Sequence, residues 1–378
     1  MKLKVTIVIP VIRIRLSIRM FSATKRILTT CALQRNHHGQ RLVAQLAGRA
    51  HLPGSDGKDF PKVLAEARND FPMTIDCEFV SSNENASAFA KCFFASLQHS
   101  IHKFGAVLLK NLPLKTGDEF SGFVHDGGLK AMNYVGGSGV RDLVAQSVST
   151  ASREPPIFTI EPHNEMAYLP YWPHLFVVFC DIPATEGGES GLTDVRDILR
   201  DLDPNVVDKF HRLGICYHRY LPDAKANDYT SWQESLMCDN KDEAERILSE
   251  SGQYFKWNED GSLCFWKTLS AFAPHYITGE MLWFNQCHSQ NASYFKAHPD
   301  FCDKDLPDDR YPFHTYYGDG SDIEPDVLQQ VREVTWKNTV GLRLDKSDVL
   351  IFDNMLIQHS RLSFRGDRKL LVSIANFY

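Results

Sequence analysis

The 378-residue sequence predicts an α+β fold with a mainly β core and flanking helices. Two observations support this prediction. From Phe255 onward, short apolar runs of strand length alternate with turn residues, whereas helical spacing is concentrated in the N-terminal part and in one insertion. Many short strands with turn signals favour a β-sandwich or barrel. A doubly wound nucleotide-binding fold is disfavoured, because strands and helices do not alternate regularly and no Gly-x-Gly-x-x-Gly follows a strand.

The spacing of apolar residues predicts the individual elements. Residues 85–103 have helical spacing, and Gly105 is expected to end this helix before a strand over 106–109. The Gly-rich segment 127–139 is expected to be a loop, either beside a site or simply irregular. The other expected elements are two strands between residues 158 and 180, helices over 195–202 and 243–248, and strands over 263–266, 281–284, 340–344, 349–352 and 370–374.

Two stretches, 127–139 and 217–260, are expected to shape a pocket, although the sequence assigns no contact to any residue in them. Trp283, Phe284 and Trp336 are interpreted as core aromatic residues rather than as substrate platforms.

Positive charge is concentrated at the N-terminus. Residues 1–55 contain ten Lys or Arg and no acidic residue, which leaves 31 basic and 47 acidic side chains for the remaining 323 residues. An acid-free, Arg-rich segment with Ser and Thr is typical of a mitochondrial transit peptide, so we predict a leader over 1–55 and a folded domain over 56–378. A disordered basic tail or a secretory signal are the alternatives, and a cytoplasmic location would follow without targeting. The apolar run Val5–Ile12 is too short to span a bilayer.

Composition disfavours two classes of protein. The net charge is −6 and no basic face is evident beyond the N-terminus, which argues against nucleic-acid binding. The nine cysteines occur singly without a Cys-x-x-Cys pair, so a zinc site is disfavoured and a reducing compartment is favoured.

The candidate chemistry begins at His163 and Glu165. They are two residues apart, so on an extended strand their side chains point to the same face. They would supply two thirds of the two-histidine, one-carboxylate triad that holds non-haem iron(II). By itself the pair is weak evidence, since a His that follows Pro162 could also be a surface turn residue.

A third ligand and a cosubstrate clamp are expected near the C-terminus. The chemistry requires a distant His and a guanidinium that grips a dicarboxylate through two hydrogen bonds, and His359 and Arg368 fit these needs. Taken singly, His359 could be a hydrogen-bonded core histidine and Arg368 a solvated charge.

Five blocks of the sequence occur together in a familiar order: His163–Ala167, Gly187–Ser190, Trp283–Gln286, Ser347–Asn354, and His359 with Arg368. Together they resemble the TauD/TfdA family of iron(II)/2-oxoglutarate dioxygenases, and most of all its clavaminate synthase-like branch. The resemblance covers about residues 60–378. It implies a double-stranded β-helix, or jelly-roll, fold for the domain 56–378.

The resemblance also implies roles for individual residues. The Fe(II) ligands, and so the catalytic centre, would be His163, Glu165 and His359. Ser190 stands where the family usually has Thr, whose hydroxyl helps to hold a 2-oxoglutarate carboxylate. Arg368 would clamp the distal carboxylate, with Arg361 and Arg365 as the alternatives.

The implied reaction uses O2 and 2-oxoglutarate, releases succinate and CO2, and hydroxylates, desaturates or cyclises a small molecule that carries an amine, a sulfonate or a carboxylate. Ascorbate would be the reductant in vitro. The expected partner is this small molecule, not a nucleic acid or a membrane, and the oligomeric state is not indicated. The alternatives are a protein-modifying jelly-roll oxygenase, whose clamp is usually a Lys, and a non-catalytic metal-binding module, which would lack a ligand or the clamp.

Overall fold

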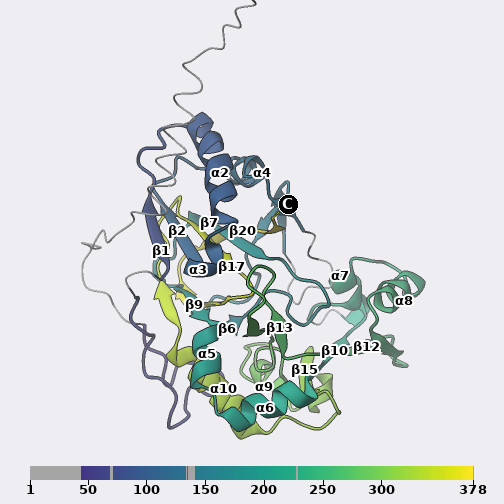
Figure 1. Ribbon diagram of the computed structural model, residues 1–378. Coiled ribbons are helices and arrows are strands. Elements are labelled where there is room, and N and C mark those ends of the chain that lie inside the picture. Colours follow the sequence, from purple (N-terminus) through teal and green to yellow (C-terminus); the bar gives the residue numbers. More distant parts are fainter. Residues whose placement is uncertain (1–43, 69–70, 133, 135–140, 227–228, 378) are drawn as a thin grey trace, which may run out of the picture.

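The computed structural model describes residues 44–68, 71–132, 134, 141–226 and 229–377. Two stacked β-sheets form its centre (Figure 1). The larger sheet consists of β1 (Met73–Asp76), β2 (Ala106–Lys110), β3 (Lys130–Ala131), β4 (Leu143–Ala145), β5 (Val148–Thr150), β7 (Leu175–Ile182), β17 (Val349–Asp353) and β20 (Lys369–Asn376). The smaller sheet consists of β6 (Ile160–His163), β9 (Ser190–Asp194), β16 (Val340–Leu342) and β18 (Ile357–Arg361).

Strand order confirms the predicted fold class. The larger sheet has the order β1-β2-β17-β7-β20-β5-β4, with β3 paired to β20, and the smaller one has the order β16-β9-β18-β6. The central strands β17, β7 and β20 come from distant parts of the chain and pair in antiparallel fashion. This is the mainly β jelly-roll that the sequence analysis predicted.

Successive side chains of β7 pack into hydrophobic clusters on opposite faces of the larger sheet, so both faces are buried. Val177 and Phe179 belong to a cluster with the helices α2 (Asn83–Leu97) and α4 (Gly117–Asp126). Phe176 and Val178 belong to the cluster that the larger sheet shares with the smaller one. Because successive side chains of a strand point to opposite faces, a strand buried on both sides must be a continuous apolar run.

A separate lobe surrounds a four-stranded sheet with the order β11-β12-β10-β15. Its strands are β10 (Ile215–Leu221), β11 (Tyr254–Trp257), β12 (Leu263–Leu269) and β15 (Phe313–Tyr317). Its helices are η1 (Ala224–Ala226), α7 (Trp232–Leu236) and α8 (Lys241–Glu250). Trp232 and Phe265 lie in the small core of this lobe.

The remaining elements are α3 (Ile101–Phe104), α5 (Val195–Asp201), α6 (Pro204–Leu213), α9 (Ala292–Phe295), α10 (Pro325–Lys337), η2 (Asp308–Arg310), β8 (Glu186–Gly187), β13 (Phe272–Pro274), β14 (Met281–Trp283) and β19 (Phe364–Arg365). The strands expected after residue 255 all occur. Within the described residues, no helix combines the length and the apolar character needed to cross a membrane.

The helices differ in places from the sequence prediction. The helix expected over 85–103 is interrupted after Leu97, where the Ser96 and Ser100 hydroxyls donate to backbone carbonyls and compete with helix continuation. Gly105, with φ of 68°, ends the second piece as expected. Helices α4, α6 and α10 were not predicted, although Pro204 and Pro325 at the starts of α6 and α10 are ordinary helix-start signals.

The packed part of the chain includes residues ahead of the charge-based boundary. Leu46 and Leu52 are buried in a cluster with Trp336 and Leu362. The boundary placed at residue 56 therefore falls inside a packed segment, and removal of a leader stays a prediction that concerns residues before Ala44.

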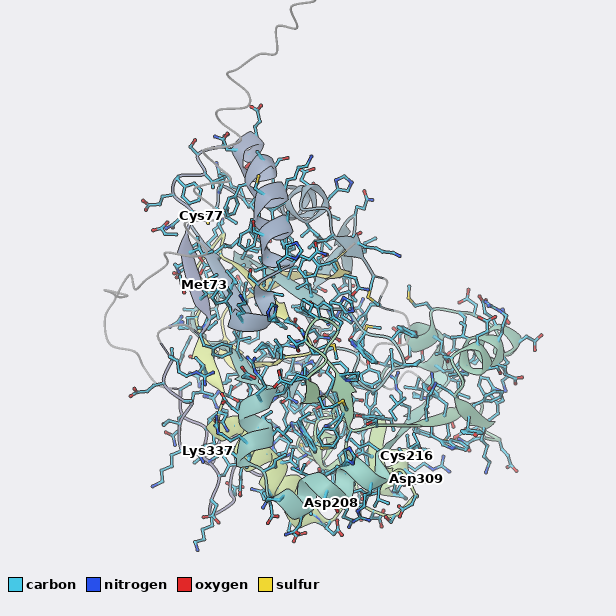
Figure 2. The ribbon with its side chains drawn as sticks, in the orientation of Figure 1. Met73, Cys77, Asp208, Cys216, Asp309 and Lys337 are labelled. Carbon is cyan, nitrogen blue, oxygen red and sulfur yellow. The ribbon has the colours of Figure 1, made fainter. Side chains whose placement is uncertain are left out.

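Met73 begins β1 and Cys77 directly follows it (Figure 2), and both side chains are buried in the cluster between the larger sheet and the helices. The three aromatic residues that were expected in the core are indeed there, since Trp283 and Trp336 are fully buried and Phe284 is 3% exposed.

Replacing Phe179 tests the face between the larger sheet and the helices. Its ring stacks on Phe120 with 5.3 Å between centroids, and Phe179→Ala would leave a cavity there. We expect a loss of about 3–5 kcal/mol in the free energy of unfolding, measured by urea denaturation. Ile182→Ala on the same strand, where the side chain is 42% exposed, should change it by no more than about 0.5 kcal/mol. Equal losses in the two variants would contradict this packing.

Candidate metal centre

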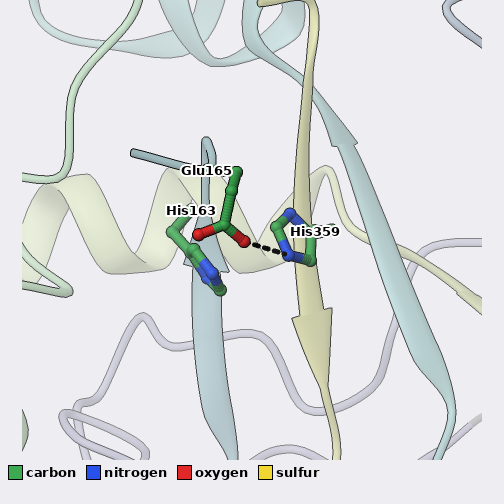
Figure 3. A group of neighbouring side chains, drawn as sticks. All are labelled: His163, Glu165 and His359. Carbon is green, nitrogen blue, oxygen red and sulfur yellow. Dashed lines mark ion pairs between the residues drawn. The ribbon is translucent and has the colours of Figure 1, made fainter. Parts of the chain in front are cut away.

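Two strands of the smaller sheet bring the predicted ligands together (Figure 3). His163 is the last residue of β6, and His359, in the middle of β18, is its direct cross-strand partner. One donor atom from each of His163, Glu165 and His359 lies within 4.8 Å of the other two. Glu165 Oε2 is 3.6 Å from His359 Nε2. This is the only such group of His, Cys, Asp and Glu donors in the described part of the chain.

Glu165 reaches the centre from a turn and not from the strand itself. The strand β6 stops at His163, and Met166 has a φ of 61°, which turns the chain immediately after Glu165. Both side chains were expected on one face of a strand. Their convergence is confirmed, but the turn is what aims the carboxylate.

The two imidazoles are prepared to bind a metal as neutral donors. His163 Nδ1 donates to the Glu161 carbonyl oxygen at 2.8 Å, which leaves the Nε2 lone pair free. Burial lowers the pKa of His163, and burial together with the neighbouring His163 holds the pKa of His359 well below its ordinary value. Two neutral imidazoles and a carboxylate are the donor set that suits non-haem iron(II), so the residues fit this metal.

A buried amide holds the backbone of Glu165 from both sides. The Glu165 N–H donates to Asn354 Oδ1 at 2.7 Å, and Asn354 Nδ2 donates to the Glu165 carbonyl at 3.0 Å and to the Pro173 carbonyl at 2.9 Å. Asn354 is fully buried. Because both backbone polar groups of Glu165 are satisfied by one buried side chain, the position of the backbone at this candidate ligand is closely defined.

Three more buried amides extend this network. Asn164 Nδ2 donates to the Asn354 carbonyl at 2.6 Å, Gln286 Nε2 donates to the Asn164 carbonyl at 2.5 Å, and Gln358 Nε2 donates to Asn164 Oδ1 at 3.2 Å. The network therefore joins the segment of His163 to β18 and to the Trp283–Gln286 block. It gives a physical reason why these blocks occur together.

Two residues that sequence reasoning missed contact the carboxylate. Tyr134 donates its hydroxyl to Glu165 Oε1 at 2.9 Å, and Arg141 Nη2 lies 2.7 Å from Glu165 Oε2. Tyr134 lies inside the Gly-rich segment 127–139 and Arg141 follows it, whereas residues 133 and 135–140 lie outside the described residues. Its expected place beside a site was the only signal that could have pointed to them.

Arg368 is the best placed of the three candidate clamps. It lines the same cavity as Ser190 and the metal ligands, and among the described residues no hydrogen bond or ion pair engages its guanidinium. Burial, followed by the proximity of Arg361, lowers its pKa to about 10, so it is still charged at neutral pH. A Cβ on Gly188 would come within 3.1 Å of Arg368 Nε, so the absence of a side chain at position 188 leaves space for the Arg368 guanidinium.

The two alternative clamps, Arg361 and Arg365, have other partners or lie at the surface. The Arg361 guanidinium donates to the backbone carbonyls of Glu154, Pro155 and Phe158 at 2.7–3.0 Å. The Arg365 side chain is 84% exposed and lies near Glu186. Neither guanidinium is available to a dicarboxylate as that of Arg368 is.

The cavity has a volume of about 1060 Å³, including solvent at its mouth. Tyr134 and Tyr229 line it, which agrees with the expectation that segments 127–139 and 217–260 shape a pocket. Apolar side chains from both sheets, among them Phe176, Leu192 and Phe352, surround the metal ligands. Trp283, Phe284 and Trp336 are not part of its wall.

Three comparisons show which known proteins this chain is similar to. The family model described as "Taurine catabolism dioxygenase TauD, TfdA family" matches residues 81–374. The dapdiamide synthesis protein DdaC of Enterobacter agglomerans is 28% identical over 271 residues, which cover 71% of this chain and 82% of that protein. A clavaminate synthase-like protein of Arabidopsis thaliana is 28% identical over 288 residues, which cover 74% and 83%. The crystal structure of PvcB from Pseudomonas aeruginosa, 16% identical, aligns with a TM-score of 0.44 over 85% of this chain and 92% of that one.

The jelly-roll and its donor set define an oxygenase class. The chain belongs to the TauD/TfdA family, since the family model matches more than half of it. It is therefore a 2-oxoglutarate-dependent dioxygenase, with Fe(II), 2-oxoglutarate and O2 as its cofactors.

Replacing Asn354 tests the amide network. Asn354→Ala removes both hydrogen bonds to the Glu165 peptide while leaving all three candidate ligands in place. We expect metal affinity to fall by about 10–100-fold, measured by Co(II) titration of folded protein. Asn205→Ala, on the exposed face of α6, is the matched control and should bind Co(II) as the parent does. Unchanged affinity in Asn354→Ala would contradict a positioning role.

Proposed function

We propose that this dioxygenase hydroxylates, desaturates or cyclises a small molecule that bears an amine, a sulfonate or a carboxylate, and releases succinate and CO2. The observation that carries the proposal is one cavity that combines three converging candidate metal donors with the guanidinium of Arg368, which makes no hydrogen bond or ion pair among the described residues. One of the relatives is named for dapdiamide synthesis, which supports a small-molecule substrate.

In this proposal, His163, Glu165 and His359 would hold Fe(II), which supplies the activation of O2. Arg368 would bind the distal carboxylate of 2-oxoglutarate through paired N–H groups, and the Ser190 hydroxyl would donate to a carboxylate oxygen. The apolar wall around the centre would exclude water from the reacting groups. A carboxylate at position 165 occupies the place that halogenating relatives leave to a halide, so oxygen-based outcomes are favoured.

We also propose that the N-terminal segment directs the protein to mitochondria. Support comes from its composition alone, with ten basic and no acidic side chains in residues 1–55. The packing of Leu46 and Leu52 favours cleavage before residue 44, because removal of those residues would expose apolar surface.

Succinate formation tests the reaction. With Fe(II), ascorbate and 2-oxoglutarate but no further substrate, we expect slow release of succinate by the parent, measured by chromatography. Glu165→Ala should lower it by at least about 100-fold, because a ligand is lost. Glu84→Ala, an exposed substitution on α2, should leave it unchanged. If Fe(II) does not bind to the parent at all, the triad assignment is wrong.

A fusion tests the targeting proposal. Residues 1–55 joined to a fluorescent protein should accumulate in mitochondria of eukaryotic cells, as seen by microscopy. Replacing Arg13, Arg15 and Arg19 with Gln should abolish this accumulation, because the positive charge is lost. A diffuse or secreted signal from the unchanged fusion would refute the proposal.

A further inference from the structure

Arg141 is a buried cation that lies directly on a candidate metal ligand. Its Nη2 atom is 2.7 Å from Glu165 Oε2, and its side chain is only 9% exposed. The guanidinium carbon lies 4.2 Å from the ring centroid of Tyr134 and 5.4 Å from that of Phe176. The two rings and the carboxylate thus hold the guanidinium in one orientation inside the cavity.

Arg141 and a metal ion would share one oxygen atom. Glu165 Oε2, which Arg141 contacts, is also the oxygen that lies 3.6 Å from His359 Nε2 and therefore faces the candidate centre. A bound dication would withdraw charge from this carboxylate and repel the neighbouring guanidinium. Filling the metal site therefore weakens the ion pair that occupies Arg141 and leaves a buried cation without a full counter-charge.

The other cations of the cavity have uses of their own. Its described lining contains three arginines, of which Arg361 is bonded to backbone carbonyls and Arg368 is assigned to 2-oxoglutarate. Arg141 remains as the cation beside the metal ligands that could recognise an incoming anion. A planar guanidinium suits carboxylate and sulfonate groups, which accept two parallel hydrogen bonds.

We propose that Arg141 binds the anionic group, a carboxylate or a sulfonate, of the substrate, and that metal binding at Glu165 makes Arg141 available for this role. The inference rests on the proposed function and narrows its substrate class to anionic molecules. By linkage, an anion bound to Arg141 must strengthen metal binding by the same factor by which the metal strengthens anion binding. The site would therefore favour the substrate when the metal is already in place.

The test is a titration of the full chain with Co(II), followed by its visible absorption, at constant ionic strength and with saturating N-oxalylglycine to occupy Arg368. Methanesulfonate and acetate are the anionic probes, added in separate arms. In the parent, at least one of them should tighten Co(II) binding by about fivefold or more. Arg141→Gln should bind Co(II) more tightly than the parent without any probe, because the repelling charge is gone, and should not respond to either probe.

Two controls keep the result specific. Arg141→Lys retains the charge and should keep part of the response, and Arg246→Gln, an exposed substitution on α8, should behave as the parent does. An equal probe response in Arg141→Gln, or no response in a parent that binds Co(II), would overturn the inference. Failure of the proposed function is distinguishable, because Glu165→Ala would then leave Co(II) binding unchanged.

Discussion

The site depends on how the backbone of one residue, Glu165, is held. The Asn354 amide bonds both the N–H and the carbonyl of Glu165, at 2.7 and 3.0 Å, in a region with no exposed surface. The sheet itself positions His163, because this residue belongs to a strand and pairs directly with His359. Glu165 lies beyond the strand, in a turn, where the sheet no longer defines its position. A fully satisfied buried amide supplies the missing constraint.

The jelly-roll fold positions the Asn354 side chain. Asn354 follows β17, a central strand of the larger sheet, while His163 and His359 belong to the smaller sheet. The hydrogen bonds from Asn354 therefore tie the two sheets together at the metal ligands. The apolar cluster shared by the sheets, which includes Phe176 and Leu192, fixes their separation. The packing between the sheets thus contributes to the geometry of the donor atoms.

The arginines that line the cavity differ in their hydrogen-bond partners. Arg361 is bonded to backbone carbonyls and so supports the wall, whereas Arg368 has no such partner among the described residues and can receive a carboxylate. All arginines look alike in the sequence, and spacing left Arg361 and Arg365 as alternatives to Arg368. Burial and hydrogen-bond partners separate them, since a guanidinium already bonded to the backbone cannot also grip a dicarboxylate.

The sequence by itself determined the fold class, the family and the three candidate ligands that converge, because strand alternation and motif order are local patterns that a chain carries in its residue types. The break after Leu97 and the helices α4, α6 and α10 were not predicted from the sequence. Competing serine hydrogen bonds cause the break, and long-range packing decides whether such helices form. Only the tertiary structure placed Arg141 and Tyr134 on Glu165, more than twenty residues away along the chain. Contacts of that kind join residues that are far apart along the chain, and no periodicity in the sequence encodes them.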